Sequence, residues 1–172
     1  KLYHAAQTGS QRIRLLNEGR ALARLQSQYV ASCYAVEEYN EYVFLVIEYV
    51  QGMSLRELLN TYHDCPERRM TTEESLRVTR ELAEGVRHVH QWGMLHRDLK
   101  PENVMITPDG DVKLIDFGLV SLIDAEGNHD RSGTPAYMAP EIVRKTIDGG
   151  DSQDADSMDE RSDIFGIGAI LY

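Results

Sequence analysis

Residues 96–118 read HRDLKPENVMITPDGDVKLIDFG, a run in which charge is concentrated around two short apolar segments. The apolar segments, 104–106 and 112–115, flank a Pro-Asp-Gly turn, and this pattern predicts a buried β-hairpin. Charged and amide side chains gather at the outer ends of the hairpin, in residues 96–103 and at Asp116. Strand ends do not need this much charge to stay soluble, so these side chains are candidates for a chemical role.

The turn predicts how the two strands pair. Glycine tolerates the positive φ of a two-residue hairpin turn, so we expect the turn to be centred on Asp109-Gly110. Pairing outward from this turn places Val104 opposite Ile115 and Asn103 opposite Asp116. Cross-strand neighbours lie roughly 5 Å apart, so an amide oxygen and a carboxylate there could share a cation such as Mg²⁺. A bulge would shift the register by one residue and turn the two side chains apart.

The residues just before the hairpin add further charged groups. Asp98 precedes Asn103 by five residues, and Lys100 lies between them. A carboxylate, an ammonium group and a divalent-metal site in one short segment suit phosphoryl transfer: the metal neutralises phosphate oxygens, the lysine steadies the transferring group, and the carboxylate orients a hydroxyl. Each residue alone is more simply a solvated loop charge, but the whole set at these spacings favours the chemistry.

Length and composition bound the class of protein. The chain has 172 residues, of which 42% are hydrophobic, as in a globular domain or a large part of one. It has no apolar run long enough to span a bilayer and no signal peptide, and it starts at Lys1 rather than Met. We therefore expect a segment of a longer cytoplasmic protein, whose remainder could hold a membrane anchor. Cys33 and Cys65 fit reduced thiols, with a single disulfide as the alternative.

The formal net charge of −10 disfavours nucleic acid as a partner. Six acidic residues lie within 146–160, a Gly/Ser/Asp-rich stretch without Lys or Arg. This composition predicts a solvated loop, and a docking segment for a basic partner is the alternative.

The first part of the chain predicts one helix and one strand. Residues 12–25 show helical periodicity, with Leu15 and Leu22 on one face and the carboxylate of Glu18 between them. A carboxylate in an apolar stripe needs a partner or water. Residues 42–50 predict a buried strand, because they are rich in β-branched and aromatic side chains.

Helices predominate after a break at Gln51-Gly52, which is a plausible hinge. Residues 53–62 predict a short helix. Thr71 opens a long helix with a capping-box pattern, and Gly93 is placed to end it. Residues 117–141 have several turn residues and predict a loop, and residues 162–172 begin an apolar helix. The apolar residues expected near one face of the long helix are Leu76, Leu82, Val86 and Val89.

Three short motifs give the chain a family resemblance. His96-Arg97-Asp98, with Asn103 at its spacing, looks like a catalytic loop; Asp116-Phe117-Gly118 looks like a metal-binding motif; Ala139-Pro140-Glu141 looks like the end of an activation segment. Together they resemble the catalytic domain of a eukaryotic-type Ser/Thr protein kinase, from about the β3 lysine to the start of helix F. The resemblance implies a two-lobed α+β fold, truncated to a partial β-rich N-lobe (residues 1–50) and a partial, mainly helical C-lobe (residues 51–172).

The resemblance also implies an activity. A transferase of this family moves the γ-phosphoryl group of MgATP to Ser/Thr hydroxyls of protein substrates, usually in signalling. Asp98 would accept or orient the hydroxyl proton, Lys100 would contact the γ-phosphate, and Asn103 and Asp116 would hold Mg²⁺. Lys100 is also typical of Ser/Thr rather than Tyr kinases, and Thr134 would form a hydrogen bond near it.

The nucleotide site follows from the same resemblance. Glu48 and Val50 would offer backbone groups to adenine, Ile47 stands at the gatekeeper position, and Met105 would form part of the adenine floor. Ile47 and Met105 are also residues that any core would accept. Glu18 looks like the helix-C glutamate that pairs with the β3 lysine. The only nearby upstream candidate is Lys1, which is otherwise an ordinary terminal lysine.

Further roles are implied at other positions. Asp163 resembles the helix-F aspartate that anchors the catalytic-loop backbone. Asp130 stands where many relatives have a phosphothreonine, so it could supply a permanent negative charge to Arg97; a solvated loop aspartate is the equal alternative. Ser121 and Ser132 are candidate phosphorylation sites. The hydrophobic column implied by the family includes Leu22, His96 and Phe117, with Cys33 a weaker candidate.

Two alternatives remain beside the kinase interpretation. A pseudokinase, acting as a scaffold on the same fold, is opposed by the presence of Asp98, Lys100, Asn103 and Asp116, but the Gly-rich loop expected before Lys1 is not in the chain. Without that loop, we expect the fragment alone to be inactive. A small-molecule kinase is the other alternative, and the segment 133–141, which resembles a peptide-binding segment, argues against it.

Overall fold

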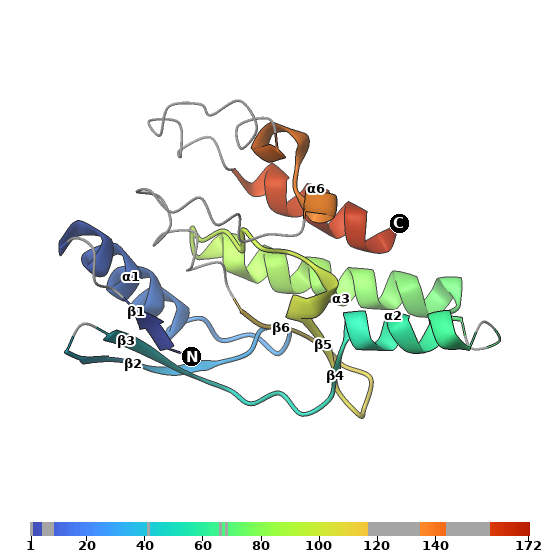
Figure 1. Cartoon of the computed structure of the whole chain (residues 1–172), viewed down its shortest axis with the longest axis horizontal. Helices are drawn as coiled ribbons and strands as arrows, with labels where there is room; N and C mark the ends of the chain where they lie inside the picture. The colour runs from blue at the N-terminus through green and yellow to red at the C-terminus, as the bar shows by residue number, and fades with distance from the viewer. Residues whose placement is uncertain are drawn as a thin grey trace.

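The computed structural model describes residues 2–4, 9–40, 42–65, 67, 69–116, 135–143 and 159–172. Within these residues the chain forms two three-stranded antiparallel sheets together with helices, so the expected α+β class is confirmed. The sheets lie side by side at the bottom of Figure 1, and the longest helix lies above the second one. The division of the chain at residues 50 and 51 stays a prediction.

The first sheet has the strand order β1 (Leu2–His4), β3 (Tyr42–Ile47), β2 (Cys33–Tyr39). Helix α1 (Gly9–Leu22) covers one face of this sheet (Figure 1). The strand predicted over 42–50 ends at residue 47. The residue pattern alone did not locate β2. The side chains buried between α1 and the sheet include Leu15, Leu22, Val43 and Leu45.

The second sheet begins with a short strand, β4 (Met53–Ser54), where the sequence predicted helix. Helix α2 (Leu55–Asp64) starts only after Ser54, because Ser54 is its N-cap. The Ser54 hydroxyl accepts the N–H of Glu57 at 3.2 Å, and the Glu57 carboxylate accepts the N–H of Ser54 at 2.7 Å. This capping box frees Met53 and Ser54 to pair with the next strand.

Helix α3 (Thr72–Gln91) forms where it was predicted. The expected capping box is confirmed, since the Thr71 hydroxyl accepts the N–H of Glu74 and the Glu74 carboxylate accepts the N–H of Thr71. Gly93 follows with φ +68, as a helix-ending glycine does. The expectation for Leu76 was wrong, because its side chain is 56% exposed. Six residues before Leu82, it lies well off the buried face of a helix with 3.6 residues per turn.

The hairpin consists of β5 (Val104–Ile106) and β6 (Val112–Leu114), and β5 also pairs with β4. Val104 lies opposite Leu114 and Ile106 opposite Val112, so the predicted pairing of Val104 with Ile115 was wrong by one residue. Correspondingly, Asn103 lies opposite Ile115, whose N–H donates to the Asn103 carbonyl at 2.9 Å, rather than opposite Asp116.

The turn itself explains this difference in register. The N–H of Gly110 donates to the Thr107 carbonyl at 2.9 Å, and the N–H of Thr107 donates to the Asp111 carbonyl at 2.9 Å. The loop therefore has three residues, with Pro108 and Asp109 in the turn and Gly110 at φ +87 after it. Three-residue hairpin loops of this kind add one residue to the strand that follows.

Helix α6 (Glu160–Leu171) packs along α3, on the side away from the hairpin (Figure 1). The described elements also include two short 3₁₀ turns, η1 (Pro101–Asn103) and η3 (Pro135–Tyr137). Val86 and Val89 of α3 and Leu114 of β6 are almost fully buried, so α3 is the central element of the core.

The two cysteines are free thiols, as expected: Cys33 is buried and Cys65 is exposed. Burial raises the pKa of the Cys33 thiol.

Among the described residues, every helix is too short or too polar to cross a membrane.

Candidate active site

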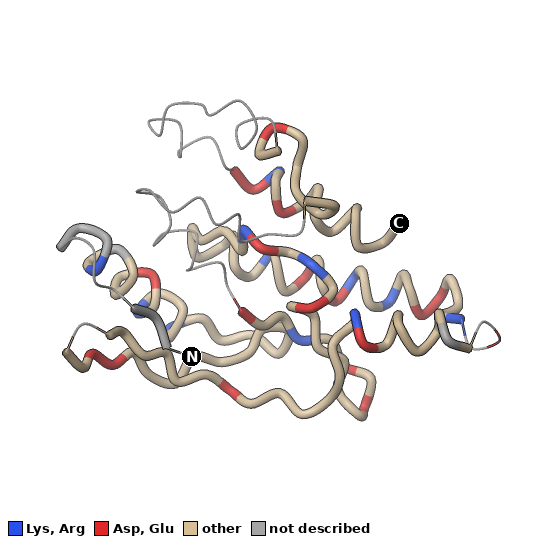
Figure 2. Tube along the Cα trace, in the orientation of Figure 1, with Lys and Arg blue, Asp and Glu red and all other residues tan. Residues whose placement is uncertain are grey.

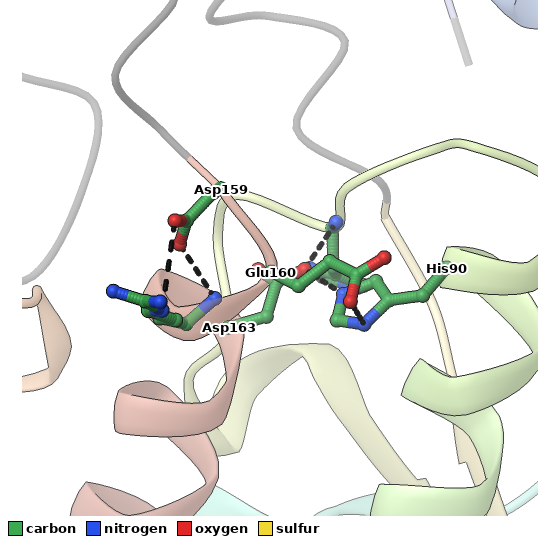
Figure 3. A network of polar contacts seen from close by, with 6 residues as sticks. His90, Asp159, Glu160 and Asp163 are labelled. Carbon is green, nitrogen blue, oxygen red and sulfur yellow. Dashed lines mark hydrogen bonds and ion pairs between the residues drawn. The ribbon is translucent and has the colours of Figure 1, made fainter.

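Asp163 connects helix α6 to the segment that carries the charged motif (Figure 3). Its carboxylate accepts the backbone N–H of His96 at 2.8 Å and that of Arg97 at 2.9 Å. The ring of His90, on α3, donates from Nε2 to the same carboxylate at 2.8 Å, and Glu160 approaches the other ring nitrogen to 4.0 Å. Asp163 is only 3% exposed. The expectation that Asp163 anchors the backbone at His96 and Arg97 is thus confirmed.

Asp163 holds the backbone at Arg97 in a conformation that is rare for residues other than glycine. Arg97 has φ +67, in the left-handed region, which costs a non-glycine residue about 1–2 kcal/mol. The bonds from two consecutive N–H groups to one buried carboxylate stabilise this conformation. The bend it produces leads the chain into Asp98.

Three of the predicted site residues meet at Asp98. The Lys100 ammonium lies 2.6 Å from Oδ2 of Asp98, and Nδ2 of Asn103 donates to the same oxygen at 2.9 Å and to the Asp98 carbonyl at 2.8 Å. Asn103 is 5% exposed, and η1 positions it through the bond from its N–H to the Lys100 carbonyl. Both side-chain contacts fall on Oδ2, which leaves Oδ1 as the oxygen able to accept a further proton. Figure 2 shows how basic and acidic residues alternate along this segment.

His96 joins the same segment to the hairpin. Its side chain is fully buried, and burial lowers the pKa of its imidazole although Asp163 and the Ile115 carbonyl act in the opposite direction. The ring is therefore neutral at pH 7, and Nε2–H donates to the Ile115 carbonyl at 3.3 Å. Asp116 comes next and has φ +56, so the chain turns sharply where the strand ends.

A cavity of about 220 Å³ lies between the two sheets and brings the predicted nucleotide-site residues together. Ile47, Glu48 and Val50 line one side of it, and Met105 and Asp116 line another. The remaining lining residues were not assigned to this site from the sequence, because apolar residues of this kind have no distinguishing signal; they are Leu22, Ala31, Leu45, Tyr49 and Ile115.

Glu48 is fixed at the edge of this cavity by contacts that the sequence did not predict. Its N–H donates to the Ser32 carbonyl at 2.8 Å, and its carboxylate accepts the N–H of Ser32 at 3.0 Å and pairs with the Lys113 ammonium. Burial raises the pKa of the Glu48 carboxyl, but the contacts with Lys113 and Ser32 outweigh it and leave the pKa below its usual value.

The expected partner of Glu18, Lys1, lies outside the described residues. Oε1 of Glu18 lies 3.8 Å from Nη1 of Arg97, and this contact links α1 to the segment 96–103. Several other predicted positions also lie outside the described residues: Thr134 of the substrate segment, Phe117 of the hydrophobic column, Ser121, Asp130, Ser132 and residues 146–158.

The sequence model of the protein kinase domain matches residues 1–172. Serine/threonine-protein kinase PknL of Mycobacterium tuberculosis is 38% identical over 158 residues, which are 90% of this chain and 36% of the relative. Serine/threonine-protein kinase cds1 of Schizosaccharomyces pombe is 33% identical over 148 residues, which are 83% of this chain and 30% of the relative. Serine/threonine-protein kinase PknB of M. tuberculosis is 34% identical over 134 residues, which are 75% of this chain and 19% of the relative. The chain thus spans about a third of the length of these relatives, or less.

Proposed function

The chain belongs to the protein kinase family, and we propose that it forms the nucleotide- and substrate-binding centre of a serine/threonine protein kinase. The observation that carries the proposal is the cluster of Lys100 and Asn103 on Oδ2 of Asp98. Asp163 holds the backbone of this segment, and Asp116 lines the cavity between the sheets. The names of the relatives favour serine and threonine as the acceptors.

Asp98 is the group that would receive the proton of the acceptor hydroxyl. Lys100 and Asn103 occupy its Oδ2, so Oδ1 would face the hydroxyl. A base of this kind must lie within hydrogen-bond reach of the proton, and a rigid support for its backbone makes that geometry reproducible. The Lys100 ammonium would donate to oxygens of the γ-phosphoryl group, where negative charge is concentrated during transfer.

ATP would bind in the cavity between the sheets. The N–H of Glu48 is already bonded to Ser32, so the carbonyl of Glu48 is the group that it could offer to adenine. Val50 would supply a second backbone group, and Ile47 and Met105 would contact the ring. The ion pair between Glu48 and Lys113 keeps the edge of this cavity in place.

The residues near Asp98 fit Mg²⁺. Nδ2 of Asn103 is bonded to Asp98, so its amide oxygen is the atom that would bind the metal, together with the carboxylate of Asp116. The part of the chain that the structure describes has no cluster of three or more His, Cys, Asp or Glu suited to a metal. Magnesium is usually held by one or two protein groups together with the phosphates of its nucleotide. When bound, Mg²⁺ neutralises the phosphate oxygens.

The test is phosphate transfer by the full-length protein. With γ-labelled ATP, Mg²⁺ and a library of peptides that contain Ser, Thr or Tyr, we expect label on Ser and Thr but not on Tyr. Asp98→Asn should abolish most of the label, whereas Asp111→Asn, at an exposed aspartate just after the hairpin loop, should not. A parent protein that binds ATP but labels no peptide would contradict the proposal and favour the scaffold alternative.

A further inference from the structure

A single guanidinium, that of Arg56, connects three segments that are distant in the sequence. Arg56 belongs to the first turn of α2, and its Nε donates to Oε1 of Glu102 at 2.8 Å. Its Nη2 donates to the hydroxyl of Tyr137 at 2.8 Å, and its Cζ lies 5.8 Å from the centre of the Tyr137 ring, within cation–π range. Glu102 is part of η1, next to Asn103, and Tyr137 is the last residue of η3.

We propose that Arg56 is a positioning residue that holds η1 and η3 in the relative arrangement needed for phosphoryl transfer to a protein substrate. The inference rests on the proposed kinase function and deepens it. It concerns the acceptor side of the site, because Tyr137 follows Thr134 by three residues and η1 carries Asn103, whose side chain contacts Asp98.

The chemistry of arginine explains why one side chain can do this. A guanidinium is planar and presents several N–H groups in a fixed fork, so it can donate to two acceptors in different directions at once. The hydrogen bonds to Glu102 and Tyr137 raise the pKa of Arg56 further. Burial raises the pKa of Glu102, but the bond from Arg56 outweighs it and leaves that pKa below its usual value. Arg56 and Glu102 are therefore both charged at neutral pH.

The exposure of the Arg56 and Glu102 side chains indicates that their contact positions η1 and η3 more than it stabilises the whole fold. The side chains of Arg56 and Glu102 are 34% and 40% exposed, and ion pairs this exposed contribute little to the free energy of unfolding. The core next to α2 does not depend on this pair, since Leu55 buries its own side chain. What the pair does fix is the spacing of η1 from η3. A displacement of about 1 Å at a reacting centre is enough to lower a rate on the order of 100-fold.

The nucleotide side of the site is independent of Arg56. Arg56, Glu102 and Tyr137 are all absent from the lining of the cavity between the sheets, as the described residues define it. A variant of Arg56 should therefore change the use of the peptide and not the binding of ATP. Substitution of a residue with only a structural role would instead alter peptide use, ATP binding and the unfolding midpoint together.

The experiment uses full-length parent protein, Arg56→Ala, Arg56→Lys, Tyr137→Phe and the double variant Arg56→Ala/Tyr137→Phe. Steady-state kinetics are measured with ATP and with the best acceptor peptide from a random Ser/Thr library. The matched control is Arg87→Ala, which removes an arginine paired with Glu84 at 2.7 Å on the exposed face of α3. Thermal unfolding is recorded for each variant.

We expect Arg56→Ala to lower kcat/KM for the peptide about tenfold, as for the loss of one charge-assisted hydrogen bond, with KM for ATP unchanged within about twofold. Arg56→Lys should recover only part of this loss, because an ammonium cannot reproduce the fork. Tyr137→Phe should add little in the Arg56→Ala background, since both variants break the same contact. The proposal is overturned if Arg56→Ala leaves kcat/KM unchanged, if KM for ATP changes equally, or if the two effects multiply independently.

Hydrogen exchange separates this inference from the proposed function. In Arg56→Ala, but not in Arg87→Ala, we expect faster exchange at the N–H groups of Asn103 and Met138, which are bonded to Lys100 and Pro135. A parent without kinase activity, in which Arg56→Ala still speeds this exchange, would contradict the function but keep the positioning role. Unchanged exchange would overturn the positioning role whatever the activity.

Discussion

The anchor at Asp163 is the contact on which the geometry of the site depends most, and Asp163→Asn tests it with almost no change of shape. The carboxylate accepts hydrogen bonds from His96, Arg97 and His90, and it is only 3% exposed. Asparagine keeps one accepting oxygen and replaces the other by an NH₂ group. At least one N–H in this cluster must then face another donor.

The magnitude follows from this count. Losing one hydrogen bond to a charged group costs about 1.5–3 kcal/mol, and a buried donor left without an acceptor costs about 1–3 kcal/mol more. We therefore expect the free energy of unfolding to fall by about 3–5 kcal/mol. Because Arg97 also loses support for its left-handed backbone, Asp98 should move, and kcat should fall on the order of 100-fold.

The assays are chemical denaturation and steady-state phosphate transfer, both on the full-length protein. Asp159→Asn is the matched control: this residue caps the same helix, its carboxylate accepts the N–H of Arg161 at 2.8 Å, and it is 60% exposed. Asparagine caps helices about as well as aspartate, so the control should change stability by less than about 0.5 kcal/mol. His90→Ala removes one donor and leaves both backbone bonds, so its effect should lie between the two.

An Asp163→Asn protein with parental stability and parental kcat would refute this reasoning. So would an Asp159→Asn protein that loses as much activity as Asp163→Asn. If Asp163→Asn does not fold, the graded His90→Ala variant still tests the His90 contact with Asp163, because a fully active His90→Ala protein with unchanged stability would show that this contact contributes nothing.

Three further outcomes are expected. Gly52 has φ +147, and a Cβ there would overlap the carbonyl oxygen of Ile106, so Gly52→Ala should lower the free energy of unfolding by about 2–4 kcal/mol in chemical denaturation. The control Gly93→Ala, with φ +68 and no atom within 4 Å of the new Cβ, should cost about 1 kcal/mol, and equal losses would contradict the steric reason. Burial lowers the pKa of His96 below 6.5, so the folded protein favours the neutral ring. The contribution of His96 to the free energy of unfolding should therefore be complete above pH 6.5 and decline as the pH falls below that value, with a shallower decline in His96→Asn. Parallel pH profiles of the parent and His96→Asn would contradict this role of His96. Asp116→Asn should raise the Mg²⁺ concentration for half-maximal transfer about tenfold or more, whereas Asp111→Asn should not, and an unchanged magnesium requirement in Asp116→Asn would exclude it as a ligand.

Local patterns in the sequence predicted the elements whose signals are local. The capping box at Thr71 and Glu74 and the helix end at Gly93 depend on residues a few positions apart, and both were confirmed. The hairpin register was missed because Pro108 allows a three-residue loop as readily as Asp109-Gly110 suggests a two-residue turn. Strand β4 has two residues and exists only through its pairing with β5, so it has no pattern of its own.

The same distinction applies to the site. Asp98, Lys100 and Asn103 lie within six residues of one another, so their spacing alone suggested a common site, and the structure brings them together. The pair of Glu48 with Lys113 and the contact of Arg56 with Tyr137 join residues 65 and 81 positions apart. Charged residues on helices and strands are usually solvated, so no single-sequence pattern distinguishes these partners before the fold brings them together.

The most direct measurement pairs nucleotide binding with phosphate transfer on the same preparations of the full-length parent and Asp98→Asn. If Asp98 receives the proton of the acceptor hydroxyl, both proteins should bind MgATP equally, and transfer to Ser/Thr peptides should fall about 10²- to 10⁴-fold in the variant. Equal transfer rates in the two proteins, with equal nucleotide binding, would contradict the role of Asp98.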